Sequence, residues 1–152
     1  LTQRLLDRFG EPLETPFPEL SRLFPAPAAL AQASGDALGQ LGIVRQRQAA
    51  ILGIARAVAE QRLALHPGAD VPATLATLKE LPGIGDWTAQ YIAMRALRWP
   101  DAFPANDLVL RRVAGNLTAA QLLKRAESWR PWRAYAAMHL WRSAADPSPS
   151  RS

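Results

Sequence analysis

The stretch Leu81-Pro82-Gly83-Ile84-Gly85-Asp86-Trp87-Thr88-Ala89-Gln90-Tyr91 decides the fold of this chain. Two glycines bracket one apolar residue, and glycine both tolerates positive φ and lets the backbone approach a ligand closely. The residues from Asp86 onward are typical of the start of a helix. Free N–H groups at a helix N-terminus attract anions, so the stretch predicts a tight turn between two helices that holds a phosphate. The same residues are also compatible with a turn that binds no ligand.

A lone carboxylate follows this turn. The second helix is expected to run to about Arg98, where Trp99-Pro100 stops it. A loop broken by proline then leads to Asp107, which lies 22 residues after Gly85 (107 − 85), and a short helix is expected over 108–113. From the residues alone the simpler interpretation of Asp107 is a helix cap.

The rest of the chain predicts an all-α fold, with multiple short helices around one core. Five prolines make residues 11–27 largely loop, and no stretch alternates as a strand would. A capping box at Thr118-Ala119-Ala120-Gln121 starts one helix, and Pro131 is expected to start the last one. The turn at Leu41-Gly42-Ile43-Val44 resembles the Leu81 turn but lacks its second glycine, and it is interpreted as structural only. We expect one helical domain over 1–145 and a disordered tail over 146–152.

Composition excludes several classes of protein. The 152 residues contain no cysteine, so disulfides, thiolate nucleophiles, cysteine zinc sites and iron–sulfur clusters are excluded. No apolar run reaches the roughly 18 residues that span a membrane, and the N-terminus shows no export signal. Net charge is −2 over residues 1–44 and +7 over 45–152, so the positive charge coincides with the Leu81 turn and everything after it. This distribution suits a polyanionic partner, although solvated arginine-rich helices are an alternative explanation.

Three separated blocks of the sequence, residues 81–91, 103–110 and 126–141, agree in their order and spacing with those of a known family. Together they resemble the helix-hairpin-helix DNA glycosylase superfamily, whose members carry a Gly/Pro-rich loop and a catalytic aspartate. Within that superfamily the chain most resembles bacterial 3-methyladenine DNA glycosylase II, the AlkA type. The resemblance extends from Leu5 to Trp141. It implies that an N-terminal β-rich domain and the first helices are absent, including the side chain that fills the gap left by a flipped base. A fragment with weak activity or none is therefore expected.

The resemblance assigns the catalytic role to Asp107. A carboxylate near C1′ would stabilise the positive charge that develops on the sugar as the base leaves, and would orient or deprotonate the attacking water. Related bifunctional enzymes carry a lysine nucleophile two residues after the last glycine of the hairpin, and here that residue is Trp87. Because the only lysines, Lys79 and Lys124, are not placed to substitute, the resemblance implies a monofunctional enzyme that uses water.

The remaining site residues are also implied by the resemblance. Trp87 and Tyr91, four apart on one helix, are expected to form the base pocket with Trp141 opposite. Their electron-rich faces would attract a positively charged alkylated purine. The other aromatic residues of the C-terminal half (Trp99, Trp129, Trp132 and Tyr135) are expected to pack in the core.

The DNA phosphate is expected on the hairpin. Its binding residues would be Gly83, Ile84, Gly85 and Thr88. The resemblance also implies a structural monovalent cation on the backbone carbonyls of Lys79, Leu81 and Ile84. We expect no metal held by side chains and no other cofactor, since His66 and His139 are isolated in the sequence.

Two functions compete on these residues. The first is a monofunctional DNA N-glycosylase of base excision repair that removes alkylated purines from double-stranded DNA, in a bacterial cytoplasm and associated with the nucleoid. The second is a non-catalytic helix-hairpin-helix module that binds duplex DNA without sequence preference. Only the first accounts for Asp107 together with the aromatic residues.

Overall fold

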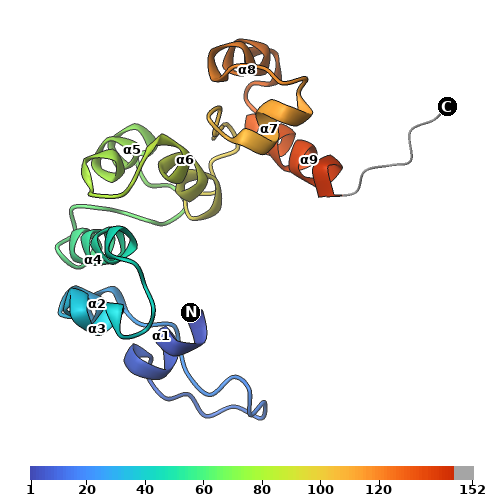
Figure 1. Ribbon diagram of the computed structural model, residues 1–152. Helices are drawn as coiled ribbons and strands as arrows, with labels where there is room; N and C mark the ends of the chain where they lie inside the picture. The colour runs from blue at the N-terminus through green and yellow to red at the C-terminus, as the bar shows by residue number, and fades with distance from the viewer. Residues whose placement is uncertain (146–152) are drawn as a thin grey trace. The chain divides into compact units, whose positions relative to one another are not determined.

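The computed structural model describes residues 1–145 and is built from helices (Figure 1). The described residues contain no strand, only an isolated antiparallel bridge between Pro12 and Arg22, so the predicted all-α class is confirmed. The expected disorder of 146–152 lies outside the described residues. No helix within 1–145 is long and apolar enough to cross a membrane. The elements are α1 (Thr2–Phe9), α2 (Pro27–Ala31), α3 (Gly35–Gly39), α4 (Arg45–Ala59), α5 (Val71–Glu80), α6 (Asp86–Arg95), α7 (Leu108–Val113), α8 (Ala119–Ala126), a 3-10 turn (Glu127–Trp129) and α9 (Arg133–Ala145).

Residues 1–145 divide into two compact units, one made of residues 1–64 and 80–83 and the other of residues 65–79 and 84–145. Each unit has its own cluster of buried apolar side chains. The expectation of one core was therefore wrong. Sequence periodicity identifies which residues are buried, but it does not say with which other helix each face packs, and these short helices group locally.

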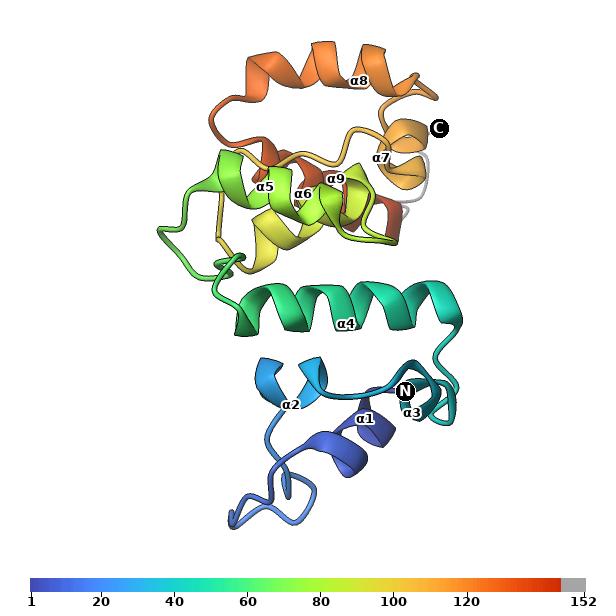
Figure 2. The ribbon, with the colours of Figure 1, turned by 90° about the vertical axis from the view of Figure 1, so that its left-hand side faces the viewer.

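In the first unit the long helix α4 packs against α2 and α3 (Figure 2). Its buried residues Leu52 and Ala55 join Leu5, Leu30 and Leu38 in one cluster. The turn between α3 and α4 was predicted at 41–44, and there Gly42 adopts a φ of 85°. This turn lies where it was expected.

In the second unit α7 packs beside α9, over a cluster that includes Leu97, Phe103, Leu110 and Leu122. Helix α7 covers the predicted residues, 108–113. The capping box before α8 is also confirmed, because the Thr118 hydroxyl accepts from the Gln121 N–H and the Gln121 side chain accepts from the Thr118 N–H. These bonds satisfy two N–H groups that the helix itself leaves unpaired.

Two helix ends differ from their prediction. Helix α6 ends at Arg95 and not near Arg98, because Arg98 adopts a φ of 55° and the Trp99 N–H turns back to donate to the Ala93 carbonyl at 3.1 Å. Helix α9 begins at Arg133 and not at Pro131. Pro131 instead belongs to a turn that the Trp132 N–H closes by donating to the Trp129 carbonyl at 2.8 Å.

Candidate active site

Asp107 lies at the start of α7, where the chain leaves the loop that follows α6. Its Oδ1 accepts from the Leu110 N–H at 2.8 Å, so the capping interpretation is confirmed. The same carboxylate also accepts two indole N–H groups. Trp87 donates to Oδ2 at 2.7 Å and Trp141 donates to Oδ1 at 3.2 Å. Asp107 is thus a helix cap and, at the same time, the centre of a polar contact between α6, α7 and α9.

These hydrogen bonds set the ionisation of Asp107. Burial raises the pKa of its carboxyl because it disfavours the charged form. Four N–H groups act in the opposite direction: the backbone N–H groups of Leu110 and Val109, and the indoles of Trp87 and Trp141. The hydrogen bonds prevail and hold the pKa below the ordinary value of 3.8, so the group is a carboxylate at neutral pH.

The three aromatic residues expected to form the base pocket do lie together. The rings of Trp87 and Tyr91 are stacked, with centroids 5.3 Å apart and an interplanar angle of 7°. Tyr91 meets Trp141 edge-to-face at 6.1 Å and 61°. Trp87 and Tyr91 remain 40% and 38% exposed, which leaves ring surface on which a planar cation could stack.

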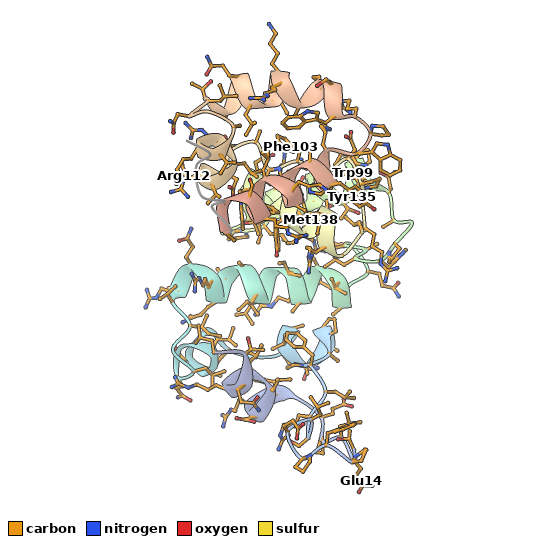
Figure 3. All side chains as sticks on the ribbon, turned by 90° about the vertical axis from the view of Figure 1, so that its right-hand side faces the viewer. Glu14, Trp99, Phe103, Arg112, Tyr135 and Met138 are labelled. Atoms are coloured by element: carbon orange, nitrogen blue, oxygen red, sulfur yellow. The ribbon has the colours of Figure 1, made fainter. Side chains whose placement is uncertain are left out.

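Two cavities of the second unit are lined by residues other than these three aromatics. One of about 230 Å³ is formed around Met94, Trp99, Tyr135 and Met138, and the last three lie close together in Figure 3. Another, of about 270 Å³, lies between Asn106 and α8. Neither lining includes Trp87, Tyr91 or Trp141, and the role of this aromatic trio as a base pocket stays a prediction.

The depressed pKa of Asp107 can be tested directly by titration. We expect Asp107 to titrate below pH 3.8, since the folded state favours its charged form. The stability that this carboxylate contributes is then fully present above pH 3.8 and is lost as the pH falls through the folded-state pKa. Carboxyl carbon NMR should show the midpoint moving upward in Trp141→Phe, which keeps a ring but removes the N–H donor. Trp99→Phe is the control, and equal midpoints in all three proteins would contradict this account.

The hairpin between α5 and α6 carries the predicted phosphate-binding residues. Gly83 adopts a φ of 81°, as expected, but Gly85 has a φ of −88°, which any residue adopts. Gly85 is the N-cap of α6, and because it has no side chain the first turn of that helix lacks the usual side-chain cap. Asp86 instead pairs with Lys79 at 2.6 Å. Uncapped N–H groups are what a phosphate would need at this helix end.

The two glycines should therefore respond differently to alanine. A Cβ on Gly83 would lie 2.9 Å from the Gln46 carbonyl oxygen, whereas a Cβ on Gly85 meets nothing within 4 Å. We expect Gly83→Ala to lower the free energy of unfolding by about 1–2 kcal/mol from the left-handed backbone alone. Gly85→Ala should leave the melting temperature nearly unchanged.

Gly85→Ala is consequently the cleaner test of the hairpin as a phosphate site. We expect it to weaken binding to damaged and undamaged DNA alike, because phosphate contacts position DNA without reading its sequence. Fluorescence anisotropy with the two duplexes measures this. A loss confined to damaged DNA would contradict a phosphate-binding role.

Two further hairpin predictions concern Thr88 and Ile84. Thr88 is partly exposed in the first turn of α6, one turn before Tyr91, and no contact tests its phosphate role. Ile84 is buried at 7% exposure, so only its backbone could meet a phosphate or a cation. Lys79 lies in the last turn of α5, where backbone carbonyls lack intrahelical partners, and Leu81 follows the end of that helix. Such oxygens are suitable donors for an alkali cation.

The aromatic residues assigned to core packing divide into two pairs. Trp99 and Trp129 are partly buried against the core of the second unit, as expected. Trp132 and Tyr135 are not, because they are 58% and 56% exposed and meet each other edge-to-face at 5.8 Å. Trp132 precedes α9 and Tyr135 lies on the outer face of that helix, so the prediction that these two residues pack in the core was wrong. Both histidines are exposed, and residues 1–145 contain no cluster of three potential metal ligands.

Sequence reasoning missed the contacts that hold the loop carrying Asp107. Gln90 of α6 accepts from the Phe103 N–H at 3.0 Å, and Asp101 is buried against Arg133 of α9. No motif predicts these bonds. The available signal was a charged residue next to the apolar run Ala102-Phe103-Pro104-Ala105, where an unpaired Asp101 would be costly.

Comparisons with known proteins show the family of the chain. A model of the HhH-GPD superfamily, described as base excision DNA repair proteins, matches residues 1–131. The chain belongs to this superfamily. Its sequence is 39% identical over 141 residues to DNA-3-methyladenine glycosylase 2 of Escherichia coli, covering 93% of this chain and 49% of that protein. It is also 39% identical over 148 residues to a probable bifunctional transcriptional activator and DNA repair enzyme AlkA of Mycobacterium tuberculosis, covering 95% of this chain and 29% of that one.

Solved structures share this fold. A DNA-3-methyladenine glycosidase from Bacillus halodurans superposes with a TM-score of 0.66 at 29% identity, covering 79% of this chain and 59% of that chain. The 3-methyladenine DNA glycosylase of Archaeoglobus fulgidus superposes with a TM-score of 0.73 at 24% identity, over 93% of this chain and 50% of that chain, which supports the fold. The chain spans about half the length, or less, of the curated relatives named above.

Proposed function

We propose that this chain forms the catalytic part of a monofunctional DNA N-glycosylase that excises alkylated purines of the 3-methyladenine type from double-stranded DNA. The observation that carries the proposal is the ionised carboxylate of Asp107, held by the indole N–H groups of Trp87 and Trp141. A carboxylate needed only as a helix cap would not require two aromatic donors from other helices. The names of the relatives support the same substrate class.

The proposed reaction replaces one bond at C1′ with another. The C1′–N bond to the base breaks, its electron pair leaves with the base, and the sugar acquires oxocarbenium character. The negative charge of Asp107 stabilises that positive charge. Water then adds its oxygen to C1′, loses a proton, and leaves an abasic sugar.

The hydrogen bonds on Asp107 favour an electrostatic role over proton abstraction. A carboxyl whose pKa lies below 3.8 is a weak base, and both of its oxygens already accept N–H groups. An ionised group in fixed orientation needs little rearrangement as charge develops on the sugar. Asp107 is therefore best suited to stabilise the cationic sugar and to orient the water.

The aromatic trio supplies the binding step. The target base must leave the duplex before it reaches Asp107. Alkylated purines such as 3-methyladenine are positively charged, and tryptophan and tyrosine faces attract cations by about 0.5–2 kcal/mol. A base that stacks on the exposed faces of Trp87 or Tyr91 would bring its sugar toward the carboxylate that Trp87 itself contacts.

No cofactor takes part in this scheme. A monovalent cation on the carbonyls of Lys79, Leu81 and Ile84 would add positive charge next to the bound phosphate. We further propose that the protein acts in the bacterial cytoplasm, on the nucleoid, where its substrate is found.

Release of free base decides between the two candidate functions. Duplex DNA that carries methylated purines is incubated with the protein, and free base, abasic sites and strand breaks are measured. We expect free methylated purines and abasic sites, with strands that break only after alkali, because Trp87 cannot form a Schiff base. Strand breaks without alkali, or trapping by borohydride, would contradict the monofunctional assignment. Equal binding of methylated and unmethylated DNA without base release would favour the non-catalytic module.

A further inference from the structure

A buried ion pair lies at the foot of the loop that carries Asp107. Arg133 donates through Nε to Oδ1 of Asp101 at 2.7 Å and through Nη2 to Oδ2 at 2.8 Å, which is a two-pronged contact. Their side chains are only 7% and 8% exposed. Arg130, which lies at the surface, donates a further hydrogen bond to Asp101 at 2.7 Å. Glu127 accepts from Arg130 at 2.9 Å and from Arg133 at 3.4 Å. All four charged groups are thus paired with one another.

A buried ion pair of this kind contributes little net stability to a fold. Removing two charges from water is costly, and well-packed apolar residues often stabilise the fold equally well. What a two-pronged pair does supply is a fixed distance and orientation between two segments. The role of this pair therefore depends on which two segments it joins.

Those segments carry two members of the candidate active site. Asp101 lies six residues before Asp107, in a loop whose residues 101–105 are all buried. Arg133 is the first residue of α9, the helix that carries Trp141 about 12 Å further along its axis. The Ala134 N–H reinforces the joint by donating to the Pro100 carbonyl at 2.8 Å. The loop and α9 meet at this end through Asp101, and at the other end through the bond from Trp141 to Asp107.

We propose that Asp101 and Arg133 are positioning residues: their buried pair sets the register between the loop and α9 so that the Trp141 indole reaches the Asp107 carboxylate. The proposal rests on the proposed function in naming Asp107 as the group that reacts. The hydrogen bond from Trp141 to the Asp107 carboxylate, at 3.2 Å, is longer than those from Trp87 and Leu110, and it is the one that depends on this register. A small slide of α9 would break it while leaving the bonds from Trp87 and Leu110 intact.

The test separates positioning from folding by replacing the pair with apolar residues. The double variant Asp101→Leu/Arg133→Met removes both buried charges at once, and Arg133→Lys keeps the charge but loses the two-pronged contact. The exposed pair of Glu60 and Arg62, 2.6 Å apart in the first unit, provides the control variant Glu60→Gln/Arg62→Gln. Each protein is measured for melting temperature, for the Trp141 indole N–H signal by NMR (assigned with Trp141→Phe), for the Asp107 titration midpoint, and for single-turnover base release.

We expect the double variant to keep the parent melting temperature within a few degrees. Its Trp141 indole proton should nevertheless move upfield, its Asp107 midpoint should rise, and its base release should fall by about 10–100-fold with unchanged DNA affinity. If the double variant is unfolded, Arg133→Lys should show the same spectroscopic changes in smaller degree. The control should match the parent in every measurement.

A folded double variant, or a folded Arg133→Lys, that keeps the parent indole signal and titration midpoint would overturn the proposal. The two spectroscopic measurements need no catalysis. A longer form of the protein that contains this chain and releases no base would therefore refute the proposed function, while the positioning of Asp107 by the buried pair would still be tested.

Discussion

Asp107→Asn is expected to slow base release by about 10²–10³-fold or more, the usual loss when one electrostatic contribution to a transition state is removed. Asparagine has nearly the same shape as aspartate, and its oxygen can still accept the Leu110 N–H that Asp107 accepts at 2.8 Å. It offers no negative charge to the cationic sugar. It also has a single acceptor oxygen, so it cannot receive the indoles of Trp87 and Trp141 on two separate oxygens as the carboxylate does.

DNA binding should hold or rise slightly in this variant, because a negative charge near the phosphates has gone. Single-turnover base release and matched binding titrations, carried out on the same preparation, separate the two effects. Asn106→Ala is a suitable control, since Asn106 is the exposed neighbour in the same loop. If Asp107→Asn releases base at the parent rate, Asp107 is only a helix cap and the catalytic assignment fails.

The local parts of this site could be predicted from the sequence because each depends on a few neighbouring residues. Helix α7 begins after Asp107 as the capping pattern indicated, and the spacing of four put Trp87 and Tyr91 on one face, where they stack. Positive φ at Gly83 follows from the same kind of local rule. The position of Trp141 beside Asp107, 34 residues away along the chain, came only from the family resemblance.

The parts that could not be predicted depend on tertiary partners. The sequence does not show that Asp101 and Arg133 meet across 32 residues, because the apolar run after Asp101 indicates that this carboxylate needs a partner but does not identify which residue it is. The exposure of Trp132 and Tyr135 was also missed, because an aromatic residue on or next to a helix is usually buried in a core. Here no described helix covers these two side chains. The two units were also missed, since helix periodicity does not name the packing partner.

Arg133→Met is expected to lower the free energy of unfolding by about 3–5 kcal/mol, the usual cost of leaving a buried charge without its partner. Asp101 would keep only the bond from Arg130, and its side chain is 8% exposed, so water cannot replace the two donors that it loses. A loss of this size is a large part of the roughly 5–15 kcal/mol that stabilises a typical domain. Urea unfolding followed by circular dichroism measures it.

The matched control is Arg130→Met, which removes a donor from the same Asp101 carboxylate at the same 2.7 Å distance. Arg130 is half exposed, so its charge is solvated whether or not the pair forms, and we expect a far smaller loss of stability. The two variants therefore differ in burial and contact geometry, while charge, residue type and partner are the same. Equal losses would mean that burial does not decide the cost, and the Asp101–Arg133 pair would then have no special place among the ion pairs of this chain.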